Sequence, residues 1–190
     1  EFPPEAMTLG NFKWHPDGEH LLVAMWVHGY PMQGHDKPIC RRSLYVASKD
    51  GREVRWLTHF GGHHSWTPDG SRVLFVDYRE GEHDGSAQGR YLHTVDFDGA
   101  NRTQVFNEVA GSHPLMHPTR NLVVDFDDDT VYAANLDTQK REVLATFSQR
   151  FDGTHKGTHP HPVWNHDGTQ VLYNSAEGGK CDIYRIDMAE

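Results

Sequence analysis

A short motif recurs four times along this chain, and its spacing is the strongest constraint on the fold. Each copy contains an anchor residue, and three copies continue into an Asp-Gly turn. The anchors Trp14, Trp66, Met116 and Trp164 are 52, 50 and 48 residues apart. A repeat of this length is typical of a β-propeller, in which each repeat forms one sheet, or blade, around a central axis.

Strand patterns follow each anchor and fill the rest of each repeat. Hydrophobic runs come first, and three of them follow Asp-Gly, a dipeptide that favours a tight turn between antiparallel strands. These runs are residues 21–27, 72–78, 122–126 and 170–175. Third strands are predicted within 43–47, 91–95, 130–135 and 182–186, and fourth strands within 50–57, 98–105 and 138–144. No amphipathic helix interrupts this pattern.

We therefore predict an all-β fold, a β-propeller of four-stranded antiparallel blades with about four blades in this chain. The repeats cover residues 9–60, 61–110, 111–156 and 157–190. The last repeat has no fourth strand in this sequence, and an open sheet edge invites pairing. Either residues 1–9 or another polypeptide is expected to supply that strand. We expect one propeller that is part of a larger ring, as a fragment or half-propeller, or completed by self-association or by a second chain.

The composition narrows the classes of partner. The formal net charge of -9 disfavours nucleic acid, because phosphate binding needs clustered positive charge. No apolar run approaches the roughly 18–20 residues that span a bilayer, so no membrane contact is expected. Two cysteines without CxxC spacing do not suggest a disulfide framework. We expect the protein in the cytoplasm or the periplasm, with the cytoplasm slightly favoured.

The chain is histidine-rich, with 15 His against 18 Lys and Arg, and several histidines occupy equivalent places in the repeats. His63, His113 and His161 each lie three residues before an anchor. Equivalent positions of successive blades converge on the axis of a propeller. The alternative is that each histidine is a repeat-consensus residue that caps a strand by hydrogen bonding. His15, His117 and His166 lie in turns and are expected to be structural.

The segment Thr158-His159-Pro160-His161-Pro162 is the sharpest local motif. In an extended segment residues i and i+2 point to the same side, and the prolines are expected to hold this segment extended. His159 and His161 can then face one ion. With His63 and His113 they form a candidate metal site, whose imidazoles suit Mn, Fe, Ni or Zn.

Several of these segments resemble those of oligogalacturonate lyases, which are β-propeller polysaccharide lyases built from TolB-like repeats. The shared segments are His63-His64-Ser65-Trp66-Thr67-Pro68-Asp69-Gly70, Ser112-His113, residues 158–162, Leu9-Gly10-Asn11 and Val27-His28-Gly29-Tyr30-Pro31. The similarity extends over nearly the whole chain but only over the C-terminal half of a full-length lyase. The His-Pro-His-Pro segment is its most specific part.

The resemblance implies a divalent metal, usually manganese, bound by three histidines and a glutamine. The matching histidines are His63, His159 and His161. The glutamine position holds Lys156 here, and a protonated lysine cannot coordinate a metal. Either His113 or water is then expected to complete the coordination sphere.

The resemblance also implies β-elimination at a 4-linked uronic acid, a reaction of pectin degradation, with an anionic oligosaccharide as substrate. The family's catalytic base, a His after Leu-Gly, is replaced by Asn11, so Asn11 and Lys156 are expected at the substrate-binding surface. His28 and Tyr30 are the nearest candidate bases. Arg41 or Arg42 is expected to pair with the substrate carboxylate.

Three functions remain open at this point. The first is a metal-dependent lyase of uronic-acid oligosaccharides. The second is a non-catalytic TolB-like propeller that binds a protein or glycan, which the departures at Asn11 and Lys156 favour. The third is a metal-dependent hydrolase, in which the metal activates water.

Overall fold

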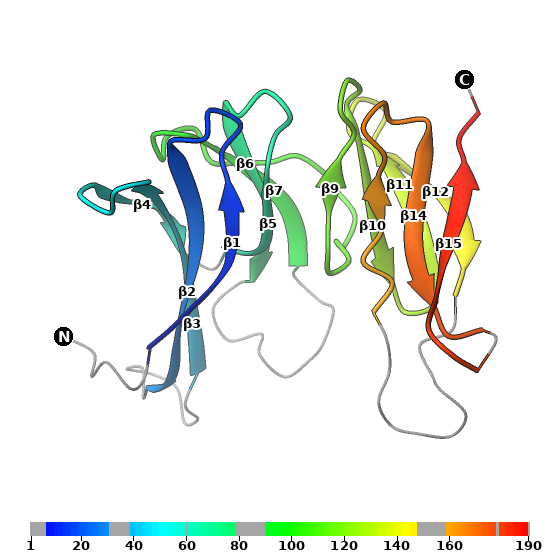
Figure 1. The fold of residues 1–190 in the computed structure, drawn as a ribbon, viewed down its shortest axis with the longest axis horizontal. Helices are drawn as coiled ribbons and strands as arrows, with labels where there is room; N and C mark the ends of the chain where they lie inside the picture. The colour runs from blue at the N-terminus through cyan, green and yellow to red at the C-terminus, as the bar shows by residue number, and fades with distance from the viewer. Residues whose placement is uncertain are drawn as a thin grey trace. The chain divides into compact units, whose positions relative to one another are not determined.

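A computed structural model describes residues 7–30, 39–59, 61–78, 90–147, 159–177 and 179–189, without the side chains of 28–30, 39–41 and 78. All the regular secondary structure within these ranges is β-strand, in four antiparallel sheets of consecutive strands (Figure 1). We call these sheets blades 1 to 4. Within the described ranges there is accordingly no helix that could cross a membrane.

The first compact unit, Glu1–Val109, contains blades 1 and 2. Each blade has the strand order expected for a meander of neighbouring strands. Blade 1 consists of β1 (Met7–Trp14), β2 (His20–Tyr30), β3 (Ile39–Ser48) and β4 (Val54–His59). Blade 2 consists of β5 (Gly61–Trp66), β6 (Arg72–Tyr78), β7 (Arg90–Asp96) and β8 (Thr103–Gln104).

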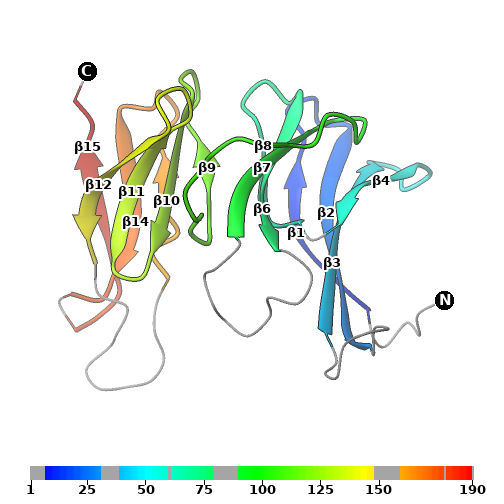
Figure 2. The same ribbon diagram turned by 180° about the vertical axis from the view of Figure 1, so that it is seen from behind.

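The second unit, Ala110–Glu190, contains blades 3 and 4, which are seen from behind in Figure 2. Blade 3 consists of β9 (Leu115–Met116), β10 (Leu122–Asp127), β11 (Thr130–Asn135) and β12 (Lys140–Thr146). Blade 4 has three described strands, β13 (Val163–Trp164), β14 (Gln170–Ser175) and β15 (Asp182–Asp187). The described part of the fourth repeat thus has the three strands that the sequence predicts. The alternative that residues 1–9 supply its fourth strand is wrong for residues 7–9, which pair with β2 of blade 1.

Each unit has its own hydrophobic core between its two blades. In the first unit, side chains of β2 and β3 pack against Trp66, Val73 and Phe75 of blade 2. In the second unit, Val124 and Phe126 pack with residues of blade 4, among them Trp164 and Val171. Because strand residues alternate between the two faces of a sheet, the hydrophobic runs of the sequence supply these cores.

The blades within a unit are joined by a repeated pair of side-chain hydrogen bonds, which we call the blade joint. In the first unit, the His15 imidazole (Nε2) donates to the Gly70 carbonyl at 3.0 Å, and the Trp66 indole donates to the Lys13 carbonyl at 3.0 Å. The two rings meet edge to face, with centroids 4.6 Å apart. The joint therefore fixes the Asp-Gly turn of blade 2 onto blade 1.

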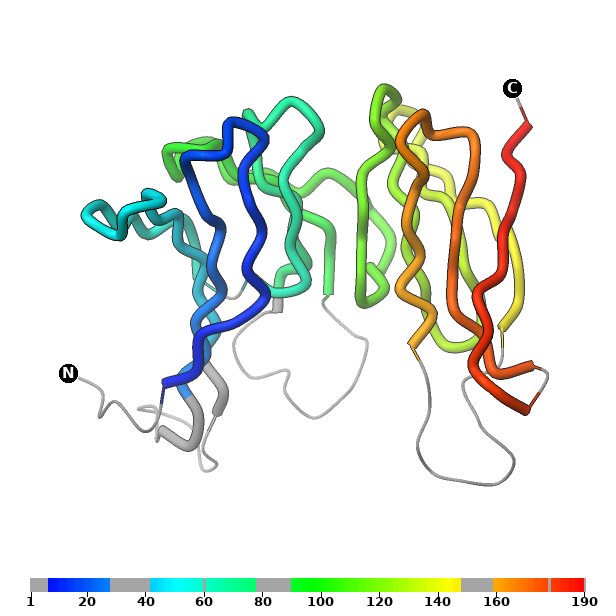
Figure 3. The backbone as a smooth tube through the Cα atoms, viewed as in Figure 1, coloured from blue at the N-terminus to red at the C-terminus, as the bar shows by residue number. Residues whose placement is uncertain are grey.

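The second unit repeats the blade joint with the matching residues. The buried His117 donates to the Gly168 carbonyl at 3.1 Å, and the Trp164 indole donates to the Leu115 carbonyl at 3.1 Å. His15 and His117 thus have the structural role expected from the sequence, since each bonds to the glycine carbonyl of the next blade. Figure 3 follows the backbone through these turns, between the first and second strand of each blade.

The residue three places before each Trp anchor has an unusual backbone conformation. Asn11, His63 and His161 have φ values of 51°, 45° and 41°, in the left-handed region that side chains other than glycine rarely adopt. In β1 and β5 this residue lies inside a break of register, between Gly10 and Lys13 and between Gly62 and Ser65. Such bulges re-aim side chains and occur next to functional sites.

Candidate metal centre

Three of the four predicted metal ligands come together in the second unit. Ligand atoms of His113, His159 and His161 all lie within 4.8 Å of one another. The ring centroids of His113 and His161 are 4.0 Å apart, and those of His159 and His161 are 5.7 Å apart. This spacing is near the span across one ion, since metal–nitrogen bonds are about 2.0–2.1 Å for zinc. The donor set therefore fits a divalent metal.

The His-Pro-His-Pro segment buries its prolines and is held to strand β14 by a backbone hydrogen bond. Pro160 and Pro162 are buried while His159 and His161 are exposed, so the segment turns its imidazoles outward. The Pro160 carbonyl accepts the amide of Asn174, on β14, at 2.8 Å. The predicted pairing of the two imidazoles on one side is consistent with this arrangement.

The prediction that the whole segment is extended is wrong at His161. Its φ of 41° is left-handed, and β13 begins only at Val163. A proline restricts mainly the ψ of the residue before it and disfavours the right-handed helical region, so it does not enforce an extended φ at His161. The two imidazoles converge through this turn in the backbone and not through the alternation of a strand.

His113 occupies a different local setting, which the sequence did not reveal. Its ring stacks on Phe126 with an interplanar angle of 9°, and its backbone amide donates to the carboxylate of Asp125 at 2.7 Å. Asp125 is fully buried, and burial raises the pKa of its carboxyl to about 7 against the opposing effect of backbone N–H donors. The signal that could have indicated this residue is an acidic side chain inside a hydrophobic run.

The fourth predicted ligand, His63, lies on β5 of the first unit and is half-buried. Its left-handed backbone matches that of His161. The neighbouring His64 is buried and donates to the Asn11 carbonyl at 2.7 Å, and burial lowers the pKa of its imidazole to about 4. His63 as a metal ligand stays a prediction.

The predicted catalytic and substrate-binding residues are only partly described. Asn11 is exposed on β1, and Arg42 is half-buried on β3, opposite Trp26 of β2. The backbones of His28, Tyr30 and Arg41 lie in strands, but their side chains are outside the described part. Lys156 lies outside the described residues altogether. The roles of these residues stay predictions.

A second histidine cluster lies at the Asp-Gly turn of blade 1. His15, Asp17 and His20 bring their ligand atoms within 4.8 Å of one another. Local hydrogen bonds account for this cluster. Nε2 of His15 donates to Gly70, its Nδ1 accepts the Asp17 amide at 3.1 Å, and Asp17 Oδ1 accepts the Glu19 amide at 2.7 Å. His15 thus has no lone pair available to a metal, and the hydrogen bonds of this cluster stabilise the Asp-Gly turn.

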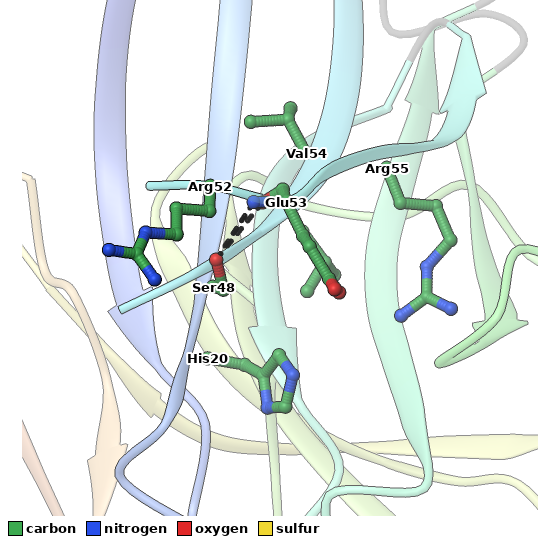
Figure 4. A pocket seen from close by; sticks show the side chains of 7 residues that line it. His20, Ser48, Arg52, Glu53, Val54 and Arg55 are labelled. Atoms are coloured by element: carbon green, nitrogen blue, oxygen red, sulfur yellow. Dashed lines mark hydrogen bonds between the residues drawn. The ribbon is translucent and has the colours of Figure 1, made fainter. Parts of the chain in front are cut away.

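The same end of blade 1 contains a cavity of about 360 Å³, lined by seven residues from His20 to Arg55. Figure 4 shows Arg52 and Arg55 on opposite sides of it, with the Glu53 amide donating to the Ser48 hydroxyl at 3.0 Å. Arg55 also lies over the Phe97 ring, 4.8 Å from its centroid. His20 of the second histidine cluster lines this cavity, but none of the predicted site residues does.

Comparisons with known proteins identify relatives that are similar to this chain in sequence. The chain is 27% identical to the oligogalacturonide lyase of Pectobacterium atrosepticum over an alignment 205 positions long, which covers 95% of this chain and 50% of that protein. A solved structure described as oligogalacturonate lyase in complex with manganese matches with a TM-score of 0.69 and 26% identity, covering 96% of this chain and 49% of that one. The chain is related to the oligogalacturonate lyases. No family model matches it.

The comparisons also confirm the predicted fold class. The β-propeller domain of the Trilobed protease from Pyrococcus furiosus matches with a TM-score of 0.60 and 12% identity, covering 98% of this chain and 56% of that one, which indicates a shared fold. The chain is therefore an all-β protein of propeller blades, related to the oligogalacturonate lyases. It spans about half the length of the lyases that it matches.

Proposed function

We propose that this chain forms part of a metal-dependent lyase that cleaves uronic-acid oligosaccharides, such as oligogalacturonate, by β-elimination. The observation that carries the proposal is the convergence of His113, His159 and His161 in a chain related to the lyases. Imidazole ligands bind a divalent cation without adding negative charge. The bound cation would attract an anionic sugar to a protein of net charge -9.

We take manganese as the metal, because a related lyase has been solved as a manganese complex. Zinc, nickel and iron are the alternatives, since imidazole suits all of them. His113, His159 and His161 would hold the ion, with His63 as a further ligand. When bound, the metal acts as a Lewis acid that stabilises the charge developing on the uronate carboxylate.

The protein's own residues would bind the sugar and move one proton. Arg41 or Arg42 would pair with the substrate carboxylate, and Asn11 and Lys156 would contact the sugar. His28 or Tyr30 would remove the C5 proton, since an asparagine at the family's base position cannot do so. The electron pair of the C–H bond forms the C4–C5 double bond, the C4–O bond breaks, and the leaving oxygen takes up a proton.

We expect an anionic oligosaccharide as the partner, and a second chain or a second copy to complete the ring. The location in the cytoplasm or the periplasm belongs to the same proposal.

The test combines metal binding with product detection. The purified chain is titrated with Mn²⁺, and oligogalacturonate turnover is followed by the ultraviolet absorbance of the unsaturated product. His159→Ala and His161→Ala are expected to abolish both signals, whereas His20→Ala, in the other histidine cluster, is expected to leave metal binding unchanged. Turnover that survives complete removal of metal would exclude the metal-dependent reaction.

A non-catalytic propeller that binds a glycan is the second candidate, and Asn11 at the family's base position favours it. The two candidates differ in what happens to a bound oligogalacturonate. A binding module holds the sugar without forming any new product. A metal-dependent hydrolase, the third reading, would give saturated ends, which mass spectrometry separates from unsaturated ends by the mass of one water.

A further inference from the structure

Asp125 is a fully buried carboxyl at a position where the fold elsewhere uses other side chains. The four blades can be aligned by their cross-strand pairs. The anchors Trp14, Trp66, Met116 and Trp164 pair with Leu21, Val73, Val123 and Val171, respectively. Two residues further along, blades 1, 2 and 4 have Val23, Phe75 and Tyr173, and blade 3 has Asp125. The blade fold therefore does not itself require an acid here.

The carboxylate of Asp125 collects the backbone amides that lead into β9. Its Oδ1 accepts N–H groups from Ser112 at 3.1 Å, from His113 at 2.7 Å and from Phe126 at 2.8 Å. Three donors on one buried oxygen offset part of the desolvation cost of the carboxylate. Two of these donors belong to the loop that carries the His113 imidazole.

Tyr132 extends this anchor to the start of the loop. Its buried hydroxyl accepts the Gly111 amide at 2.9 Å and donates to Asp125 Oδ2 at 3.4 Å. A Cβ at Gly111 would collide with the Phe126 carbonyl, so the loop lies directly against β10. Residues 111–113 are thus bound at three consecutive amides.

The other residues at this repeat position are held in another way. Asn11, His63 and His161 adopt a left-handed backbone, but His113 does not. Asp125 supplies at His113 an anchor that takes the place of that backbone turn. Burying a carboxylate costs free energy, and here it fixes the backbone amide of His113, whose ring centroid lies 4.0 Å from that of His161.

We propose that Asp125, supported by Tyr132, is a positioning residue that holds His113 in the three-histidine metal site. This inference rests on the proposed function, because it assumes that the cluster binds a metal. Residues that orient metal ligands typically contribute ~10–100-fold to metal affinity. Asp125 would act through the backbone of His113 and would not touch the metal.

The test is a double-mutant cycle read out as Mn²⁺ affinity of the whole chain. Asp125→Val, which introduces the type of side chain found in blade 1, is expected to weaken Mn²⁺ binding ~10–100-fold. Asp125→Asn keeps an acceptor oxygen and is expected to retain most of the affinity. In a His113→Ala background, Asp125→Val is expected to cause no further loss, since coupled residues are not additive.

If Asp125→Val does not fold by circular dichroism, Tyr132→Phe replaces it, because this change removes only the hydroxyl that joins Gly111 to Asp125. Tyr184→Phe, in the same unit, is the control and is expected to bind Mn²⁺ like the wild type. Additive losses from Asp125 and His113, or unchanged affinity in Asp125→Val, would overturn the positioning role and leave the metal site standing. A wild-type chain that binds no Mn²⁺ would overturn the metal site, and the positioning role with it.

Discussion

The two units share one framework but differ at the residues that could carry function. Both use a His-to-Gly and a Trp-to-carbonyl hydrogen bond to join their blades, with donor–acceptor distances between 3.0 and 3.1 Å. At the position three residues before the anchor, the first unit has Asn11 and His63, and the second has His113 and His161. The shared hydrogen bonds therefore belong to the fold, whereas His113 and His161 belong to the candidate metal site.

The way this position is held differs as well. In the first unit, the Asn11 carbonyl accepts a hydrogen bond from His64 of the next blade. In the second unit, Pro162 occupies the place of His64 and has no donor, and His113 is held by Asp125 of its own blade. In the second unit, ligand atoms of His113, His159 and His161 lie within 4.8 Å of one another, which is the proximity that a shared metal requires.

The joint tryptophans should be equally important in the two units. Trp66→Ala and Trp164→Ala each remove a large side chain that is 8% exposed, and each is expected to lower the free energy of unfolding by ~3–5 kcal/mol. Trp14→Ala, at an exposed counterpart on β1, should have a much smaller effect. Denaturant unfolding measures all three, and a large difference between Trp66 and Trp164 would break the equivalence of the units.

Metal should act unequally on the two units. At a metal concentration of 100 times Kd, the occupied site is stabilised by ~2.7 kcal/mol, and its amides should exchange roughly 100-fold more slowly. Hydrogen exchange with and without Mn²⁺ is expected to show this protection in residues 111–117 and 159–164. Protection that also extends to residues 61–66 would include His63 in the site, and no protection in either unit would contradict a metal centre.

The turn glycines should be sensitive wherever a joint histidine lies over them. Gly70→Ala and Gly168→Ala place a Cβ against His15 and His117, in addition to the ~1–2 kcal/mol cost of a left-handed backbone. Gly51→Ala has a similar φ of 71° with open space around it, so it is expected to show the backbone cost alone. Thermal unfolding of the three variants measures the joint contribution, and equal losses would argue against it.

The smallest expected effect is the pH dependence of the second joint. Burial lowers the pKa of His117, whose neutral ring donates to Gly168 and accepts the amides of Thr119 and Arg120. Below about pH 6.5 the unfolded chain takes up a proton that the folded chain resists, so stability falls as pH decreases toward the folded pKa. His117→Gln should remove up to one proton from this slope, measured by unfolding at a series of pH values. An unchanged slope would show that His117 does not contribute to it.

Much of the fold followed from the repeat. The predicted runs 72–78, 130–135 and 170–175 coincide with β6, β11 and β14, because alternating hydrophobic residues and Asp-Gly turns specify strands locally. The prediction of an extended His161 failed, because a local rule about proline does not fix the φ of the residue before it. Asp125 was not predicted to contact His113, because the contact joins a strand residue of β10 to the loop before β9.

The sequence by itself determined the class of sheet, the repeat and the identity of the imidazoles, since these depend on neighbours close along the chain. Tertiary structure alone decided that His113 meets His159 and His161, that Asp125 holds the first of them, and that His15 and His117 serve the blade joints. The physical reason is that hydrogen bonds and metal ligation depend on positions in space. Such positions are fixed only when the strands pair and the blades pack, which brings together residues as far apart in the chain as His117 and Gly168.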